Sequence, residues 1–144
     1  MNAALSSTSS TKIGLGALLR AAITGGVIAA VANMAVYGIG RAVGVDFIGR
    51  FDPAQAPTPL MPFLPAVASL IPAVLAGFVA LGFARMLKRP AMPFAVLAVV
   101  FGVVSMAGPM GLADASTGTK VVLSLMHVVA GVPITVWILR ALGK

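Results

Sequence analysis

The sequence AAITGGVIAAVANMAVYGIG, residues 21–40, runs for twenty positions without a charged side chain. An α-helix rises about 1.5 Å per residue, so a helix of this length is about 30 Å long. That length matches the hydrocarbon core of a bilayer, which roughly 20 apolar residues can cross. The stretch therefore predicts a transmembrane helix.

The rest of the chain has the same character, since 60% of its 144 residues are hydrophobic and only 9% are charged. Soluble domains carry about 25% charged residues, so this chain has too little polar surface to cover a fold in water. Three more charge-free apolar stretches run over about residues 61–84, 90–112 and 121–139. We predict an all-α fold, an integral membrane bundle of four transmembrane helices. It would form a single domain over residues 1–144, beginning with a disordered tail at residues 1–12.

The charged residues lie outside the predicted spans and are shared unevenly between the two sides. Because four spans place both termini on one side, that side holds seven basic residues and no acidic one: Lys12, Arg20, Arg85, Lys88, Arg89, Arg140 and Lys144. The other side balances three basic residues with three acidic ones: Arg41, Arg50, Lys120, Asp46, Asp52 and Asp114. The positive-inside rule then predicts cytoplasmic N and C termini. The net charge of +7 would favour anionic lipid headgroups at the cytoplasmic face, so no nucleic-acid partner is needed to explain it.

The longest connection is the outer loop, residues 41–60, which contains three prolines. A long loop with little regular structure is often functional. The simpler interpretation is a lid that covers the outer end of the bundle.

Each predicted span carries a polar residue on the face that holds its small residues, and this face should point into the bundle. The four residues are Asn33, Ser69, Ser105 and His127, the only histidine of the chain. Each lies seven or eight positions inside the outer end of its span, which is about 10–12 Å. We therefore predict one polar layer, with one side chain per helix, in the outer half of the bundle. Tyr37, one turn from Asn33, would cap this layer from the outer side.

Two interpretations of the layer stay open. It can be a network of hydrogen bonds between helices, with His127 and Asn33 as the expected pair, and such bonds average about 0.6 kcal/mol in membranes. Alternatively, it can form the floor of an outward-facing cavity that admits a small ligand, water or protons. Ionisable residues inside a membrane are candidates for functional sites.

Several kinds of chemistry find no support in the sequence. Cysteine is absent and no carboxylate lies in any predicted span, so thiol chemistry and carboxylate-driven proton coupling are disfavoured. One histidine cannot supply a metal site or a hydrolase triad. A haem could take His127 with Met34, Met106 or Met126 as axial ligands, but methionines in so apolar a chain are better explained by core packing. We expect no catalytic residues, no cofactor, no metal site and no enzyme activity.

The layout resembles a family of small uncharacterised bacterial four-helix membrane proteins, known as a domain of unknown function. Three segments carry the resemblance: AAITGGVIAAVANMAVYGIGRAVGV at 21–45, TPLMPF at 58–63 and TGTKVVLSLMHVVAGVPI at 117–134. It extends over residues 20–142, and its most specific feature is the pair Met126-His127 followed by Pro133. The resemblance implies four spans and a plasma-membrane location, and no assigned activity.

We therefore expect a multi-pass protein of the bacterial plasma (inner) membrane that is not an enzyme. The leading hypothesis is an accessory subunit of a partner membrane protein, or a homo-oligomer, held together by small-residue helix faces. The alternative is a carrier or sensor of a small apolar or weakly polar ligand bound at the polar layer. A membrane enzyme that uses His127 as a lone base ranks third.

Overall fold

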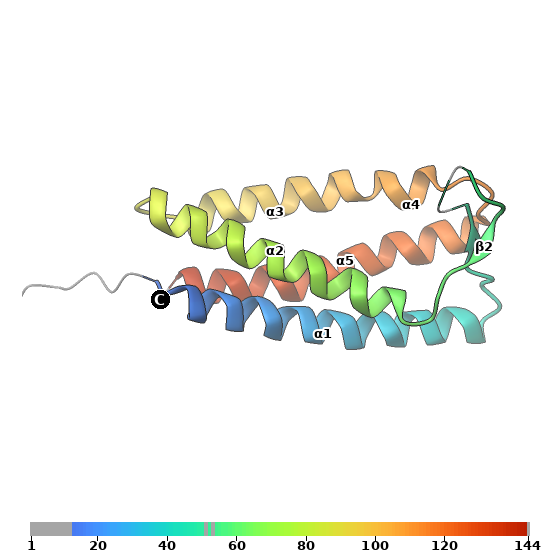
Figure 1. Ribbon diagram of the computed structural model, residues 1–144, viewed down its shortest axis with the longest axis horizontal. Helices are drawn as coiled ribbons and strands as arrows, with labels where there is room; N and C mark the ends of the chain where they lie inside the picture. Colours follow the sequence, from blue (N-terminus) through green and yellow to red (C-terminus); the bar gives the residue numbers. More distant parts are fainter. Residues whose placement is uncertain (1–12, 51, 53, 144) are drawn as a thin grey trace, which may run out of the picture.

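The computed structural model describes residues 13–50, 52 and 54–143, so the predicted tail at residues 1–12 lies outside the described part of the chain. Within this part, the elements in chain order are α1 (Leu15–Ala42), β1 (Ile48–Gly49), β2 (Thr58–Pro59), α2 (Leu64–Met86), α3 (Ala91–Ser105), α4 (Ala107–Gly111) and α5 (Thr117–Leu142). Figure 1 shows the helices running along the long axis of an elongated bundle, with the strands at one end. The described chain ends lie together at the opposite end.

Four helical segments of the described chain are long and apolar enough to cross a membrane: Leu15–Ala42, Leu64–Met86, Ala91–Gly111 and Thr117–Leu142. The prediction of a mostly helical fold with four such segments is confirmed. α1 starts earlier and α5 ends later than predicted, because absence of charge is too strict a criterion for a helix end. A long arginine side chain can stay in the helix and carry its charge to the polar boundary.

The third segment is interrupted, since α3 ends at Ser105 and α4 begins at Ala107. Pro109 has no N–H to donate to the carbonyl of Ser105, four residues earlier, and its ring crowds that carbonyl. The N–H of Met106 donates to the carbonyl of Val103 at 3.1 Å, a tighter turn than an α-helix has. Pro109 therefore explains the break.

The most extensive helix contacts are those of α1 with α2 and with α5. Small residues make the first of them: a Cβ atom on Gly26 would lie 2.7 Å from the Cβ of Ala73, and one on Gly77 would lie 2.9 Å from the Cβ of Ala22. Helices that meet through glycine and alanine can bring their backbones close together. α1 and α2 pack in this way.

The contact between α1 and α5 involves backbone atoms of α5. A Cβ atom on Gly25 would lie 2.8 Å from the Cα of Ile134 and 2.9 Å from the carbonyl oxygen of Pro133. Neither of these atoms can move without moving α5. The adjacent residues Gly25 and Gly26 thus set the distances from α1 to α5 and to α2.

The apolar core follows these two contacts. Its buried residues come from α1, α2 and α5, with one from α3: Leu18, Ala22, Ala29, Ala73, Ala80, Leu81, Phe94, Ile134, Ile138 and Leu142. α3 packs mainly against α5 and buries only Phe94. α1 therefore lies between α2 and α5 and packs tightly against each of them, while α3 lies mainly against α5.

The outer loop contains a short antiparallel pair, β1 with β2, in which Ile48 faces Pro59 and Gly49 faces Thr58. The all-α prediction missed this pair, because two-residue strands show no alternation that a sequence pattern could reveal. Arg50 forms a salt bridge of 2.7 Å with Asp114, in the connection between α4 and α5. The loop is thereby joined to the far side of the bundle.

The glycine contacts give a direct test. We expect Gly25→Ala to destabilise the protein by about 1–3 kcal/mol, because its Cβ would collide with the backbone of α5. Thermal unfolding in detergent, followed by circular dichroism, measures the effect. The matched control is Gly38→Ala in the same helix, where a Cβ meets no atom within 4 Å. Equal unfolding temperatures for the two variants would contradict the assigned role of Gly25.

Candidate functional site

The polar layer begins with a buried hydrogen bond between α1 and α2. The side-chain amide of Asn33 donates to the hydroxyl oxygen of Ser69 at 3.0 Å, and that hydroxyl donates to the carbonyl of Pro65 at 2.7 Å. Asn33 is only 4% exposed and Ser69 only 1%. The amide oxygen of Asn33 is buried and has no hydrogen-bond partner. An unsatisfied acceptor of this kind is costly and is often satisfied by water or a ligand.

His127 lies on α5 at the same level and is partly buried. Its Nδ1 lies 2.8 Å from the carbonyl oxygen of Leu123, one turn earlier. A carbonyl can only accept a hydrogen bond, so Nδ1 must carry the proton in this arrangement. In the neutral ring, the other nitrogen is then an acceptor. Asn33, expected as the partner of His127, bonds to Ser69 instead.

Asn33 and His127 meet at a cavity of about 120 Å³ between α1, α2 and α5. It is lined by Asn33, Leu60, Leu64, Pro65, Ala68, Leu123, Met126, His127 and Ala130. A water molecule occupies about 30 Å³ in the liquid, so the space would hold about four waters or one small molecule. Two of the predicted polar residues therefore face a common space.

Ser105 takes no part in this site. Its hydroxyl donates to the carbonyl of Gly102 in its own helix at 2.7 Å, and it does not line the cavity. The depth of Ser105 along its helix could be counted from the sequence. Its distance from α1 could not, because α3 packs mainly against α5. The prediction of one contribution from each helix is thus wrong for Ser105, and the layer joins three helices.

Tyr37, predicted as a cap, lies on the side of the site toward the strand end of the bundle. Its hydroxyl donates to the carbonyl of Leu60 at 3.4 Å, and Leu60 lines the cavity. The ring of Tyr37 also stacks at a tilt on Phe47, with centroids 4.7 Å apart. Tyr37 therefore helps to hold Leu60 in the wall of the cavity.

Phe47, which sequence reasoning did not place in the site, anchors the outer loop over it. Its ring is fully buried, and a Cβ on Gly40 would lie 2.7 Å from the ring atom Cζ. The backbone of Phe47 has a φ of +51°, a conformation that bulky L-residues disfavour. Its carbonyl accepts from the N–H of Leu60 at 2.8 Å. Burial of the ring against Tyr37 and Gly40 compensates for the backbone strain.

Asp46, the preceding residue, joins the same loop to the start of α5. Its carboxylate accepts hydrogen bonds from the hydroxyls of Thr119 at 2.7 Å and Ser116 at 3.1 Å, and from the N–H of Ile48 at 3.3 Å. Ser116 is the N-cap of α5 and accepts from the N–H of Thr119 at 3.2 Å. A negative charge at a helix N-terminus is also favoured by the helix dipole. Ser116 before an apolar run could be recognised as a cap in the sequence, but Asp46 gave no such signal.

The same contacts change the acidity of Asp46. The hydrogen bond from Thr119, and then that from Ile48, lower the pKa of the Asp46 carboxyl below its usual value of 3.8, although desolvation opposes them. The charged form of Asp46 therefore holds the outer loop in place.

The sequence matches a family described as "Family of unknown function (DUF6069)" over residues 14–144. The chain belongs to this family. The match covers every helix of the structure, and it confirms the predicted resemblance to a domain of unknown function. No curated protein and no solved structure matches the chain. The description of DUF6069 names no reaction, so a function for this chain has to be inferred from the chemistry of its residues.

That chemistry is sparse. Among the residues that the structure describes, no three His, Cys, Asp or Glu side chains lie close enough together to hold a metal ion. In the described part of the chain, the one hydrogen bond of His127 is to its own helix, at the carbonyl of Leu123. The site offers a small cavity with two hydrogen-bond acceptors, lined in part by Leu60, whose carbonyl accepts from Tyr37.

The acidity of Asp46 predicts a dependence of stability on pH. Because its pKa is lower in the folded state, its contribution is complete above about pH 4 and is lost as the pH falls through the lowered pKa. We expect Asp46→Asn to unfold at a lower temperature than wild type at pH 7, and the difference to shrink toward about pH 2. Asp52→Asn is the control, because the bonds of the Asp52 side chain to described residues stay within its own turn, at Ala54 and Gln55. A difference between Asp46→Asn and wild type that is the same at both pH values would contradict the assignment.

Proposed function

We propose that this protein is a non-enzymatic, multi-pass protein of the bacterial plasma membrane that acts by associating with other helices in the membrane. Its partner would be a second copy of the chain or a larger membrane protein that it serves as an accessory subunit. The observation that carries this proposal is the exposure of the third helical segment. Only 6% of its most apolar 18-residue stretch is buried inside the bundle, against 39% for the corresponding stretch of α1.

The surface of α3 is apolar on nearly every side. Its exposed large residues are Met92, Val96, Leu97, Val99, Val100, Phe101, Val103 and Val104. Gly102 is also loosely surrounded, since a Cβ there would meet no atom within 4 Å, in contrast to Gly25 and Gly26. Glycine and alanine at a helix surface permit close approach of another helix in a membrane. These features favour α3 as the helix that meets a partner.

The distribution of charge supports a location of the N and C termini in the cytoplasm. The end of the bundle that holds the chain termini carries Arg20, Arg85, Lys88, Arg89 and Arg140 in the described residues, without an acidic side chain. The strand end carries basic and acidic residues in equal number, among them the bonded pair Arg50 and Asp114. The positive-inside rule would place the basic end in the cytoplasm, against anionic lipid headgroups.

Cysteine crosslinking in native membranes tests the association. The chain has no cysteine, so Val100→Cys on α3 and Val31→Cys on α1 each introduce a single thiol at an exposed position. We expect oxidation to crosslink Val100→Cys, either to a product of twice the chain mass or to a larger partner. Val31→Cys is the control and should stay uncrosslinked. The proposal is wrong if neither variant crosslinks, because lipid alone would then cover α3. It is also wrong if both crosslink equally, because the crosslinks would then show no preference for α3.

A second candidate function is favoured by the unpartnered oxygen of Asn33. This acceptor and the free ring nitrogen of His127 would suit a small ligand that donates hydrogen bonds, held in the 120 Å³ cavity. The protein would then act as a carrier or sensor of that ligand.

Mass spectrometry of molecules extracted from gently purified protein tests this candidate. We expect a retained small molecule in wild type and in the control Ser105→Ala, whose hydroxyl bonds only within α3. The His127→Leu variant should not retain the small molecule, and it should unfold at the same temperature as wild type. If His127→Leu lowers the unfolding temperature and no molecule is retained by wild type, the layer is structural.

A further inference from the structure

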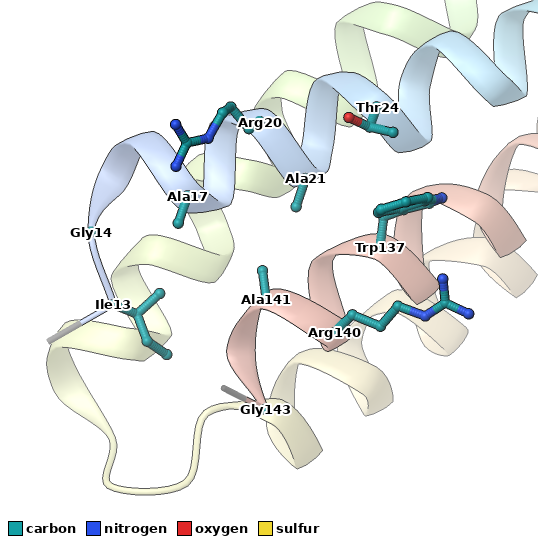
Figure 2. Close-up of a pocket in the computed structure, with 10 residues that line it drawn as sticks. All are labelled: Ile13, Gly14, Ala17, Arg20, Ala21, Thr24, Trp137, Arg140, Ala141 and Gly143. Carbon is teal, nitrogen blue, oxygen red and sulfur yellow. The ribbon is translucent and has the colours of Figure 1, made fainter. Parts of the chain in front are cut away.

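A second and larger cavity lies at the end of the bundle that holds the chain termini. It is a groove of about 730 Å³ between the first turns of α1 and the last turns of α5. Figure 2 shows Ala17 and Ala21 of α1 and Ala141 of α5 pointing toward one another across it. The floor of the groove is therefore apolar and made of small side chains.

The rims of this groove are basic. In Figure 2 the side chain of Arg20 extends on the side of α1 that faces away from α5, and Arg140 extends from α5 past Trp137; both residues line the groove. The guanidinium of Arg140 lies 5.4 Å from the centroid of the Trp137 ring, a distance at which cation–π attraction acts. Both arginines are exposed.

The three acidic side chains of the sequence, at Asp46, Asp52 and Asp114, belong to the outer-side connections and lie far along the chain from both arginines. The groove thus combines an apolar floor with two cationic edges.

The start of α1 adds positive potential to the same place. Gly14 is the N-cap and offers no side chain, and the first turn of α1 contains no acidic residue. The unpaired N–H groups of a helix N-terminus carry partial positive charge. This field reinforces the two arginines.

The level of the groove corresponds to a membrane boundary. Arg20 and Arg41 lie 21 residues apart in α1, which is about 31 Å of helix. Lys120 and Arg140 lie 20 residues apart in α5, which is about 30 Å. Both lengths equal the hydrocarbon thickness of a bilayer. Arg20 and Arg140 would therefore lie at the depth of lipid phosphates, with Trp137 in the position that interfacial tryptophans prefer.

We propose that this groove binds an anionic phospholipid. The exposed side chains of Arg20 and Arg140 would turn toward the phosphate, which would accept hydrogen bonds from their guanidinium groups. The glycerol and the start of an acyl chain would lie on the alanine floor and continue past Thr24 toward Ile28, one turn further along the same face of α1. Arginine suits phosphate because its planar donors can bind two oxygens at once.

The apolar floor selects a lipid over a soluble phosphate. A free phosphate ester would gain the contacts to the arginines but would leave the alanines of the floor and the ring of Trp137 uncovered. The inference rests on the proposed insertion in a membrane and does not depend on association through α3.

Native mass spectrometry of the full chain from nanodiscs that contain equal amounts of phosphatidylglycerol and phosphatidylcholine tests the site. We expect wild type to retain phosphatidylglycerol in preference to phosphatidylcholine. The double variant Arg20→Gln with Arg140→Gln should lower the preference about tenfold. Arg85→Gln is the matched control, an exposed arginine at the same end that does not line the groove, and it should behave as wild type.

Two further variants keep the test decisive if the double variant folds poorly. Arg20→Lys with Arg140→Lys keeps both charges and should retain most of the preference. Ala17→Leu fills the floor without changing the charge and should lower retention of phosphatidylglycerol.

Three results would overturn the proposal. One is an equal preference for phosphatidylglycerol in wild type and the double variant. Another is equal retention of both lipids by wild type, and the third is displacement of phosphatidylglycerol by soluble glycerol phosphate. Incorporation into the nanodiscs is measured first. A chain that fails to incorporate contradicts membrane insertion itself, whereas one that incorporates without a preference contradicts only this lipid site.

Discussion

The approach of α1 to its two neighbours at Gly25 and Gly26 is the constraint on which the rest of the structure depends. A side chain on Gly25 would meet the backbone of α5, and one on Gly26 would meet Ala73 of α2. Apolar helices gain little from burying apolar surface when lipid surrounds them, so close packing through small residues has to hold them together. Adjacent residues lie on different sides of a helix, so Gly25 faces α5 and Gly26 faces α2.

The polar site follows from the same crossing. Two turns outward along α1 from these glycines lies Asn33, and two turns outward along α5 from Ile134 lies His127. One turn along α2 from Ala73 lies Ser69, which accepts the hydrogen bond from Asn33. The register that the glycines set is therefore the register that assembles the cavity. α3 has no comparable contact, and its Ser105 stays outside the site.

The two ends of the bundle differ in how they use charge. At the strand end, Asp46 accepts hydrogen bonds that hold the outer loop to the N-terminus of α5, and Arg50 pairs with Asp114, so that these charged groups are bonded within the chain and Phe47 is kept over the site. At the other end, Arg20 and Arg140 border an open groove between α1 and α5. One end is closed by its own residues, whereas the other offers its charge to a partner.

The sequence by itself determined the class of fold, because charge-free runs of about 20 residues have few structures available to them other than membrane-spanning helices. It also gave the depth of each polar residue, since the rise per residue of a helix is constant. Asn33 and Ser69 lie in hydrogen-bond contact, and His127 lines the same cavity as Asn33, at the level that this count gives. The pairing of Asn33 with Ser69 in place of His127 was not predictable.

Only the tertiary structure decided which helices pack together and which faces meet. Rotation about a helix axis and distance between helices depend on contacts between residues far apart in sequence, such as Gly25 with Ile134 or Asp46 with Thr119. No local pattern encodes these contacts. For the same reason the groove between Arg20 and Arg140 could not be recognised in the sequence, where the two residues lie near opposite ends of the chain.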